Sequence, residues 1–120
     1  YCAREIVLFR EDLMQKIFRN SVRAPSSRKL GPEHLLKTLQ SQSHLSPFTL
    51  PVSPVYWEFD YALTLYPLPD LVVLFDTNEQ FSVENNDSTL ANPGSFSRND
   101  LCFQVYFPAS GQVEDSVVKL

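Results

Sequence analysis

Leu71 to Phe75 form an unbroken apolar run, and this run constrains the fold more than any other part of the chain. A strand with one face in water alternates apolar and polar residues, whereas a strand covered on both faces is apolar throughout. We therefore predict that this run is the central strand of a sheet in an α/β protein. The predicted fold class is a layered arrangement of a mixed sheet with flanking helices.

The first residues of the chain predict a strand followed by a helix, which is typical of α/β proteins. Glu5 to Phe9 has the pattern of a short buried strand. From Glu11 to Val22, one helical stripe collects the apolar side chains of Leu13, Met14, Ile17, Phe18 and Val22. A buried strand normally has neighbours on both sides, and the chain begins at Tyr1. We therefore expect a fragment with further strands upstream.

The middle of the chain predicts two more helices joined by a stiff loop. One helix is expected to start at Gly31-Pro32-Glu33, because proline fits the first helical turn. Its buried face would consist of Leu35, Leu36 and Leu39. Residues 46 to 54 contain three prolines, which exclude a helix there and favour an extended connection. Helical spacing then returns at Trp57, Tyr61, Ala62 and Leu65.

The last third of the chain predicts further strands. A polar loop is expected from Glu84 to Ser88, and a short strand through Thr89 and Leu90 follows it. That strand enters a turn formed by Asn92, Pro93, Gly94 and Ser95. From Leu101 to Phe107 apolar residues alternate with Cys102, Gln104 and Tyr106, which predicts a strand with its apolar side buried. Residues 111 to 120 are expected to form an edge strand or to fray.

Charge is divided unevenly along the chain. Residues 1 to 50 carry eight basic and four acidic side chains, a net charge of +4, whereas residues 51 to 120 carry two basic and ten acidic ones, a net charge of −8. Because phosphate neutralisation supplies most of the affinity for nucleic acids, the acidic part is a poor DNA surface and a suitable dock for a basic partner. An ordinary solvated face is the alternative. No apolar stretch is long enough to span a membrane.

Reactive side chains of α/β proteins gather in the loops that follow the carboxyl ends of strands. After Phe75 that loop reads Asp76-Thr77-Asn78, and it contains a single carboxylate. Neither His34 nor His44 has a second donor at metal-ligand spacing. We therefore interpret Asp76 as a turn residue and the two histidines as surface or capping residues. Catalysis, metal binding and a bound cofactor are not expected.

A strand introduced by Pro-Asp, a loop, and then Asn92-Pro93-Gly94-Ser95 together resemble the C-terminal half of the calcineurin-like metallophosphoesterases. In active members of that family the loop carries Gly-His-x-His, and its imidazoles bind one of two metals. This chain has Phe75, Asp76, Thr77 and Asn78 at that place. The resemblance thus implies a degenerate metal loop, with the Asn92 to Ser95 turn kept as architecture. Residues 1 to 120 would be the C-terminal portion of one inactive phosphoesterase-like domain.

Longer matches resemble the C-terminal region of the B subunits of DNA polymerase epsilon, which are inactive phosphoesterase relatives. They run nearly from end to end of the chain and include His44-Leu45-Ser46-Pro47, Pro54-Val55-Tyr56-Trp57, Tyr66-Pro67-Leu68-Pro69-Asp70 and Val113-Glu114-Asp115-Ser116. The resemblance implies a non-catalytic accessory subunit in the nucleus. Its implied partners are the C-terminal zinc-binding region of the catalytic subunit, other replication-fork proteins, and DNA through the assembled complex.

An aromatic group is the one further candidate binding feature, and it consists of Tyr56, Trp57, Phe59, Tyr61 and Tyr66. Glu58 and Asp60 are interleaved with it, where a base-stacking platform would need basic residues. Core packing is the favoured interpretation, and partner contact through Tyr56, Trp57, Tyr61 and Tyr66 is the second.

Two rival functions stay open at this point. The first is a fragment of an active metal-dependent phosphoesterase. The second is direct DNA binding through the basic side chains Arg19, Arg23, Arg28, Lys29 and Lys37. The ends of the first helix offer a structural reason for some of these charges, because acidic residues suit a helix start and basic residues suit its end.

Overall fold

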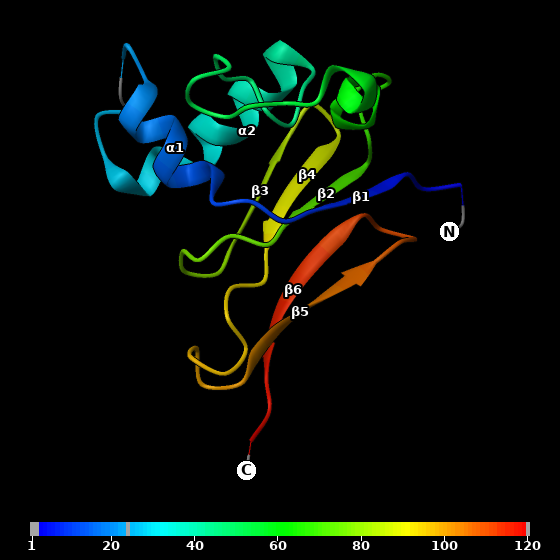
Figure 1. The fold of residues 1–120 in the computed structure, drawn as a ribbon. Helices are drawn as coiled ribbons and strands as arrows, with labels where there is room; N and C mark the ends of the chain where they lie inside the picture. Colours follow the sequence, from blue (N-terminus) through cyan, green and yellow to red (C-terminus); the bar gives the residue numbers. More distant parts are fainter. Residues whose placement is uncertain (1–2, 24, 120) are drawn as a thin grey trace.

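A four-stranded mixed sheet with two helices on one face forms the main body of the computed structural model, which describes residues 3–23 and 25–119 (Figure 1). The strands lie in the order β1 (Ile6–Phe9), β2 (Leu71–Leu74), β4 (Ser88–Asn92) and β3 (Phe81–Asn85). The helices are α1 (Leu13–Asn20) and α2 (Gly31–Gln42). Two 3-10 helices, η1 (Arg28–Leu30) and η2 (Trp57–Leu63), lie in the connections. The α/β class and the mixed sheet with flanking helices are confirmed.

β2 is the interior strand that the apolar run predicts. It pairs in parallel with β1 on one side and with β4 on the other. Three of its four residues are buried, as expected for a strand with a neighbour along each edge and helices over one face. β3 then pairs with β4 in antiparallel fashion, which makes the sheet mixed.

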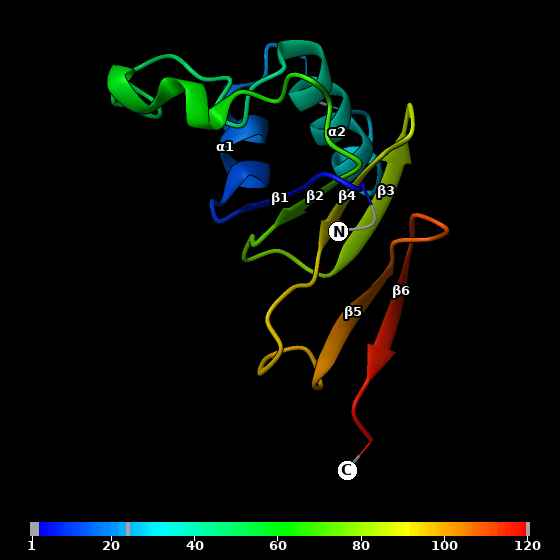
Figure 2. The same cartoon turned by 90° about the vertical axis from the view of Figure 1, so that its right-hand side faces the viewer.

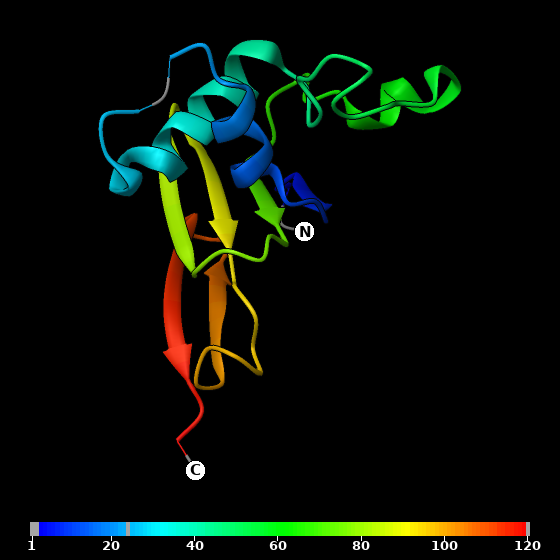
Figure 3. The same cartoon turned by 60° about the vertical axis from the view of Figure 1, so that its left-hand side comes forward.

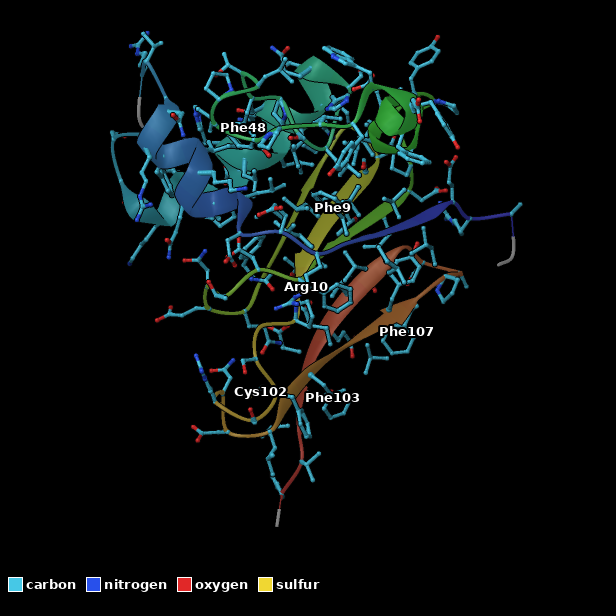
Figure 4. The ribbon with its side chains drawn as sticks, in the orientation of Figure 1. Phe9, Arg10, Phe48, Cys102, Phe103 and Phe107 are labelled. Carbon is cyan, nitrogen blue, oxygen red and sulfur yellow. The ribbon has the colours of Figure 1, made fainter. Side chains whose placement is uncertain are left out.

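The hydrophobic core lies between the sheet and the two helices, on the side where α1 and α2 cover it in Figures 2 and 3. α1 and α2 each contribute a buried apolar stripe, and the sheet contributes side chains from β2 and β4. The fully buried members include Leu13, Leu35, Leu39, Leu74 and Leu90. Phe48 from the proline-containing connection packs against the same core (Figure 4). That connection contains no helix, as its prolines predict.

The prediction that the first strand is buried is wrong in part. β1 begins at Ile6 and lies at the edge of the described sheet. Val7 and Phe9 pack against the core, whereas Leu8 on the opposite face is 67% exposed. A short apolar run does not reveal whether both faces of a strand are covered, because an edge strand with one packed face can have the same composition.

The first helix is shorter than its apolar stripe predicts, whereas the second agrees with the prediction. α1 begins at Leu13 and ends at Asn20, so Val22 lies outside it and is exposed. α2 begins at Gly31, has Pro32 in its first turn, and buries the predicted leucines. Ser43 follows in a left-handed conformation that ends the helix.

One strand was absent from the sequence prediction. The predicted polar loop at Glu84 to Ser88 contains the last two residues of β3 and the first residue of β4. Only Asn86 and Asp87 form the turn, and both have positive φ angles. Asparagine and aspartate tolerate this left-handed conformation, so the pair makes a tight hairpin that its polarity disguised as a longer loop.

β5 (Cys102–Phe107) and β6 (Gln112–Val117) form a separate antiparallel hairpin, which extends away from the helices (Figure 1). The strand at residues 101 to 107 is confirmed, and so is a strand in the tail. The predicted facing is reversed: Phe103 and Phe107 point to the same outer side of β5 and are exposed (Figure 4). Gln104 faces the sheet instead, where its amide donates to the backbone oxygen of Phe81.

Candidate functional site

The three parallel strands β1, β2 and β4 end at one edge of the sheet, and polar side chains follow each of them. Asp12 comes after β1, Asp76 and Asn78 come after β2, and Asn92 is the last residue of β4. We name these four residues the carboxyl-edge cluster. Their meeting at one edge follows from the parallel pairing, which places the carboxyl ends of all three strands together.

Asp76 is the centre of the carboxyl-edge cluster and is buried. Its Oδ2 accepts a hydrogen bond from the backbone N–H of Met14 in the first turn of α1, at 3.0 Å. Its Oδ1 accepts bonds from the backbone N–H of Asn78, at 3.1 Å, and from the Asn78 side-chain amide. A carboxylate with these three donors satisfies the start of a helix and closes its own turn.

Asn92 joins the loop after β2 to the turn after β4. Its side chain is fully buried, and its Nδ2 donates to the backbone oxygens of Asn78 and Glu79 at 3.4 and 3.3 Å. Its Oδ1 accepts from the backbone N–H of Gly94 at 3.0 Å. Gly94 has a φ of +68°, a conformation that glycine adopts without steric cost. The predicted loop and the predicted turn thus lie against each other.

The chemistry of the carboxyl-edge cluster is that of a hydrogen-bonded structural joint. Both carboxylate oxygens of Asp76 and Oδ1 of Asp12 already accept backbone or amide hydrogens of this chain. A cation that used these oxygens would therefore have to displace bonds that hold α1 and the loop in place. In residues 3–23 and 25–119, no three His, Cys, Asp or Glu side chains form a group that could hold a metal ion.

The aromatic group lies elsewhere, on a protrusion formed by η2 and the residues that flank it. We name residues 56 to 66 the aromatic knob, which extends beyond β1 on the right of Figure 3. All five of its aromatic side chains are exposed, and Tyr56 reaches 84%. The favoured prediction of core packing is therefore wrong. No residue of η2 is fully buried, and its member that packs against the core is Leu63 and not an aromatic residue, which helical spacing alone does not reveal.

A comparison with protein families identifies the relatives of this chain. A family model for the B subunit of DNA polymerases alpha and epsilon matches residues 1–83. The chain belongs to the DNA polymerase alpha/epsilon B-subunit family. This match contains β1, both helices, the aromatic knob, β2 and the Asp76 loop, and the sequence resemblance to B subunits is confirmed.

Individual members of the B-subunit family match nearly the whole chain. DNA polymerase epsilon subunit 2 of Mus musculus is 51% identical over 116 residues, which cover 97% of this chain and 22% of the mouse protein. The B subunit of DNA polymerase epsilon from Arabidopsis thaliana is 42% identical over 96% of this chain and 22% of the plant protein. The Saccharomyces cerevisiae protein of the same name is 31% identical over 92% of the chain and 21% of its own length. The chain therefore spans about a fifth of these relatives.

The two histidines of this B-subunit family member are half-buried. His34 lies in the first turns of α2. His44 Nδ1 accepts the backbone N–H of Ser46 at 3.0 Å, so its Nε2 carries the hydrogen and donates to Asp60 Oδ1 at 3.1 Å. His44 thereby fixes η2 to the residues that follow α2.

The basic residues of the DNA-binding hypothesis lie in different surroundings, and Arg23 lines a hollow with residues of α1, α2 and the proline-containing connection. Arg19 and Lys29 line an open hollow of about 960 Å³ between α1 and the loop after β2, which Glu79 also lines. Lys37 lies 4.0 Å from Glu33 on the next turn of α2. The Arg28 side chain lies outside the described residues.

No described helix has the length and apolar composition needed to cross a membrane.

Sequence reasoning missed the role of Asp12. The helix dipole explains an acidic residue before α1, but the Asp12 side chain does not cap that helix. Its Oδ1 instead accepts the backbone N–H of Thr77 at 3.1 Å. The signal in the sequence was that Asp12 and Asp76 each follow a predicted strand. That signal does not show which backbone N–H groups donate to the two carboxylates.

Proposed function

We propose that this chain is the C-terminal portion of a non-catalytic accessory subunit of DNA polymerase epsilon, which scaffolds the catalytic subunit in nuclear DNA replication. Membership of the B-subunit family supports the complex, and relatives from animals, a plant and yeast carry the epsilon name. In this proposal the polymerase activity resides in another subunit.

The single observation that carries the non-catalytic assignment is the bonding of Asp76. In the proposed inactive calcineurin-like fold, Phe75 to Asn78 occupy the place of a metal-binding loop. Imidazoles are the expected ligands there, and this loop offers one carboxylate whose two oxygens accept three bonds from the chain itself. The loop holds α1, β2 and β4 together, which supports a structural role for this edge of the sheet.

The proposed partner is the C-terminal zinc-binding region of the catalytic subunit of polymerase epsilon, with other replication-fork proteins and DNA met through the assembled complex. Surface chemistry supports protein contact, because the exposed apolar and aromatic side chains of the knob are of the kind enriched at protein interfaces. The acidic second part of the chain supports contact with protein rather than direct contact with DNA.

Co-purification tests the proposal. The full-length subunit, co-expressed with the catalytic subunit of polymerase epsilon, should be recovered with it in a stable complex. Recovery of the catalytic subunit in the absence of this subunit, together with failure of the two to associate, would contradict the proposed function. Hydrolysis of a phosphate ester by the full-length subunit with added manganese, lost on Asp76→Asn, would show that the active phosphoesterase hypothesis is the right one.

A further inference from the structure

The aromatic knob is a fixed protrusion and not a loose loop. Two backbone bonds pair its base with the residues after α2: Leu45 N–H donates to Leu63 O, and Leu65 N–H donates to Ser43 O, each at 2.8 Å. His44 and Asp60 add a side-chain bond at 3.1 Å. Leu45 and Leu65 are buried in the main core. The knob therefore presents its rings on a base that is already ordered, which lowers the entropic cost of binding.

No basic residue lies near the aromatic knob in the sequence. The sequence contains no lysine or arginine between Lys37 and Arg98. Glu58 is exposed beside Trp57, and among the described residues no lysine or arginine forms an ion pair with it. The Asp60 carboxylate accepts a hydrogen bond from His44 Nε2 at 3.1 Å. The five exposed rings and the exposed carboxylate of Glu58 thus belong to one protrusion.

Exposed aromatic rings next to a carboxylate favour a cationic ligand. The faces of tryptophan and tyrosine attract ammonium and, more often, guanidinium groups, and a neighbouring carboxylate adds a charge-assisted hydrogen bond. The same carboxylates repel the phosphates of a nucleic acid, whose bases the rings could otherwise stack. An acidic peptide is repelled for the same reason.

We infer that the aromatic knob is a docking site for an arginine-bearing basic segment of a partner protein, held by Trp57 and its neighbouring tyrosines with Glu58 as the charge partner. The inference rests on the proposed function, because an accessory subunit acts by protein contact, and it adds the chemistry of one contact. Arginine suits the site better than lysine because its planar group can stack on a ring while it donates to a carboxylate.

Fluorescence anisotropy with the intact subunit tests the inference. The probes are three labelled peptides that alternate glycine with arginine, glutamine or glutamate. The arginine peptide should bind at least about tenfold more tightly than the other two. Trp57→Ala/Tyr61→Ala should weaken its binding by about tenfold, and Glu58→Gln should weaken it and reduce its salt dependence. The matched control, Phe103→Ala/Phe107→Ala, removes two exposed rings from the hairpin and should leave binding unchanged.

Four results would overturn the inference. They are the absence of arginine-peptide binding, equal binding of the glutamine peptide, equal loss in the hairpin control, and binding of a labelled single-stranded oligonucleotide that is lost in Trp57→Ala/Tyr61→Ala. The co-purification experiment separates the two proposals. A subunit that still associates with the catalytic subunit but fails to bind the arginine peptide leaves the proposed function standing and removes the knob inference alone.

Discussion

The carboxylate of Asp76 accepts the backbone N–H of Met14 at 3.0 Å, although the two residues are far apart in the sequence. The exchange is reciprocal, because Asp12 before α1 accepts the backbone N–H of Thr77 at 3.1 Å. Each loop thus satisfies a donor of the other. This crossed pair fixes the start of α1 against the end of β2, which aligns the helix on the sheet.

Removal of the Asp76 carboxylate should destabilise the protein. Asp76→Ala leaves the Met14 N–H without its acceptor at a buried helix start, and we expect a loss of about 2 kcal/mol in the free energy of unfolding. Asp76→Asn keeps one acceptor oxygen and should cost less. Urea denaturation measures both variants against the exposed neighbour Glu79→Gln as control. If Asp76→Ala is as stable as that control, the joint is not a structural one.

Two glycines with similar backbone conformations should respond differently to alanine. Gly94 and Gly111 have φ angles of +68° and +75°, so both substitutions carry the strain of a left-handed residue. A Cβ at Gly94 would lie 3.3 Å from the backbone nitrogen of Gln80, whereas at Gly111 nothing lies within 4 Å. Gly94→Ala should therefore lower the free energy of unfolding by about 1 kcal/mol more than Gly111→Ala. Equal losses would mean that the Gly94 turn has room to shift.

Elements with a strong local pattern could be predicted from the sequence. The unbroken apolar run at Leu71 and the leucine stripe of α2 each indicate which residues are buried, so both elements were located correctly. β3 was missed because its residues are half-buried at the sheet edge and its turn is only Asn86 and Asp87. The outward facing of Phe103 could not be read from alternation, since period two shows that a strand has two faces and not which face is covered.

The candidate site, like the fold, could be predicted from the sequence only in part. Residue type predicted that the Asp76 loop lacks the imidazoles of a metal loop, and parallel pairing explains why it meets Asn92. The crossed bonds of Asp12 and Asp76 depend on the angle at which α1 leaves the sheet, which no local pattern records. The aromatic rings of the knob fit a core as well as a surface by composition, so composition does not reveal that all five are exposed.

Asp70 gives the fold a dependence on acid. The backbone N–H of Glu5 donates to its Oδ2 at 2.9 Å, and the Arg4 guanidinium contacts its Oδ1 at 2.6 Å. The Glu5 hydrogen bond is the larger cause and the Arg4 contact the next, and together they lower the pKa of Asp70 below its ordinary value. The ionised form is therefore favoured in the folded state, where it ties β1 to β2.

The sign of the pH effect follows from that lowered pKa. The stabilisation by Asp70 is complete above the ordinary aspartate pKa and is lost as the pH falls through the lower pKa of the folded state. Asp70→Asn should therefore flatten the acid limb of the unfolding free energy measured by urea titration at several pH values. Arg4→Gln should flatten it less, because the Glu5 bond remains. A steeper acid limb in Asp70→Asn would contradict the assignment.

The hairpin offers a test of which side of β5 is covered. Leu90 is fully buried between the sheet and the helices, and Leu90→Ala should cost about 3 kcal/mol in the free energy of unfolding. Phe103 lies on the outer face of β5 and is 38% exposed, so Phe103→Ala should cost about 1 kcal/mol, less than the Leu90 change. From residue size alone, the larger phenylalanine would be the costlier loss. The size of the side chain and its burial in the structure therefore predict opposite orders for the two variants. A cost at Phe103 equal to that at Leu90 would show that another part of the protein covers this face of the hairpin.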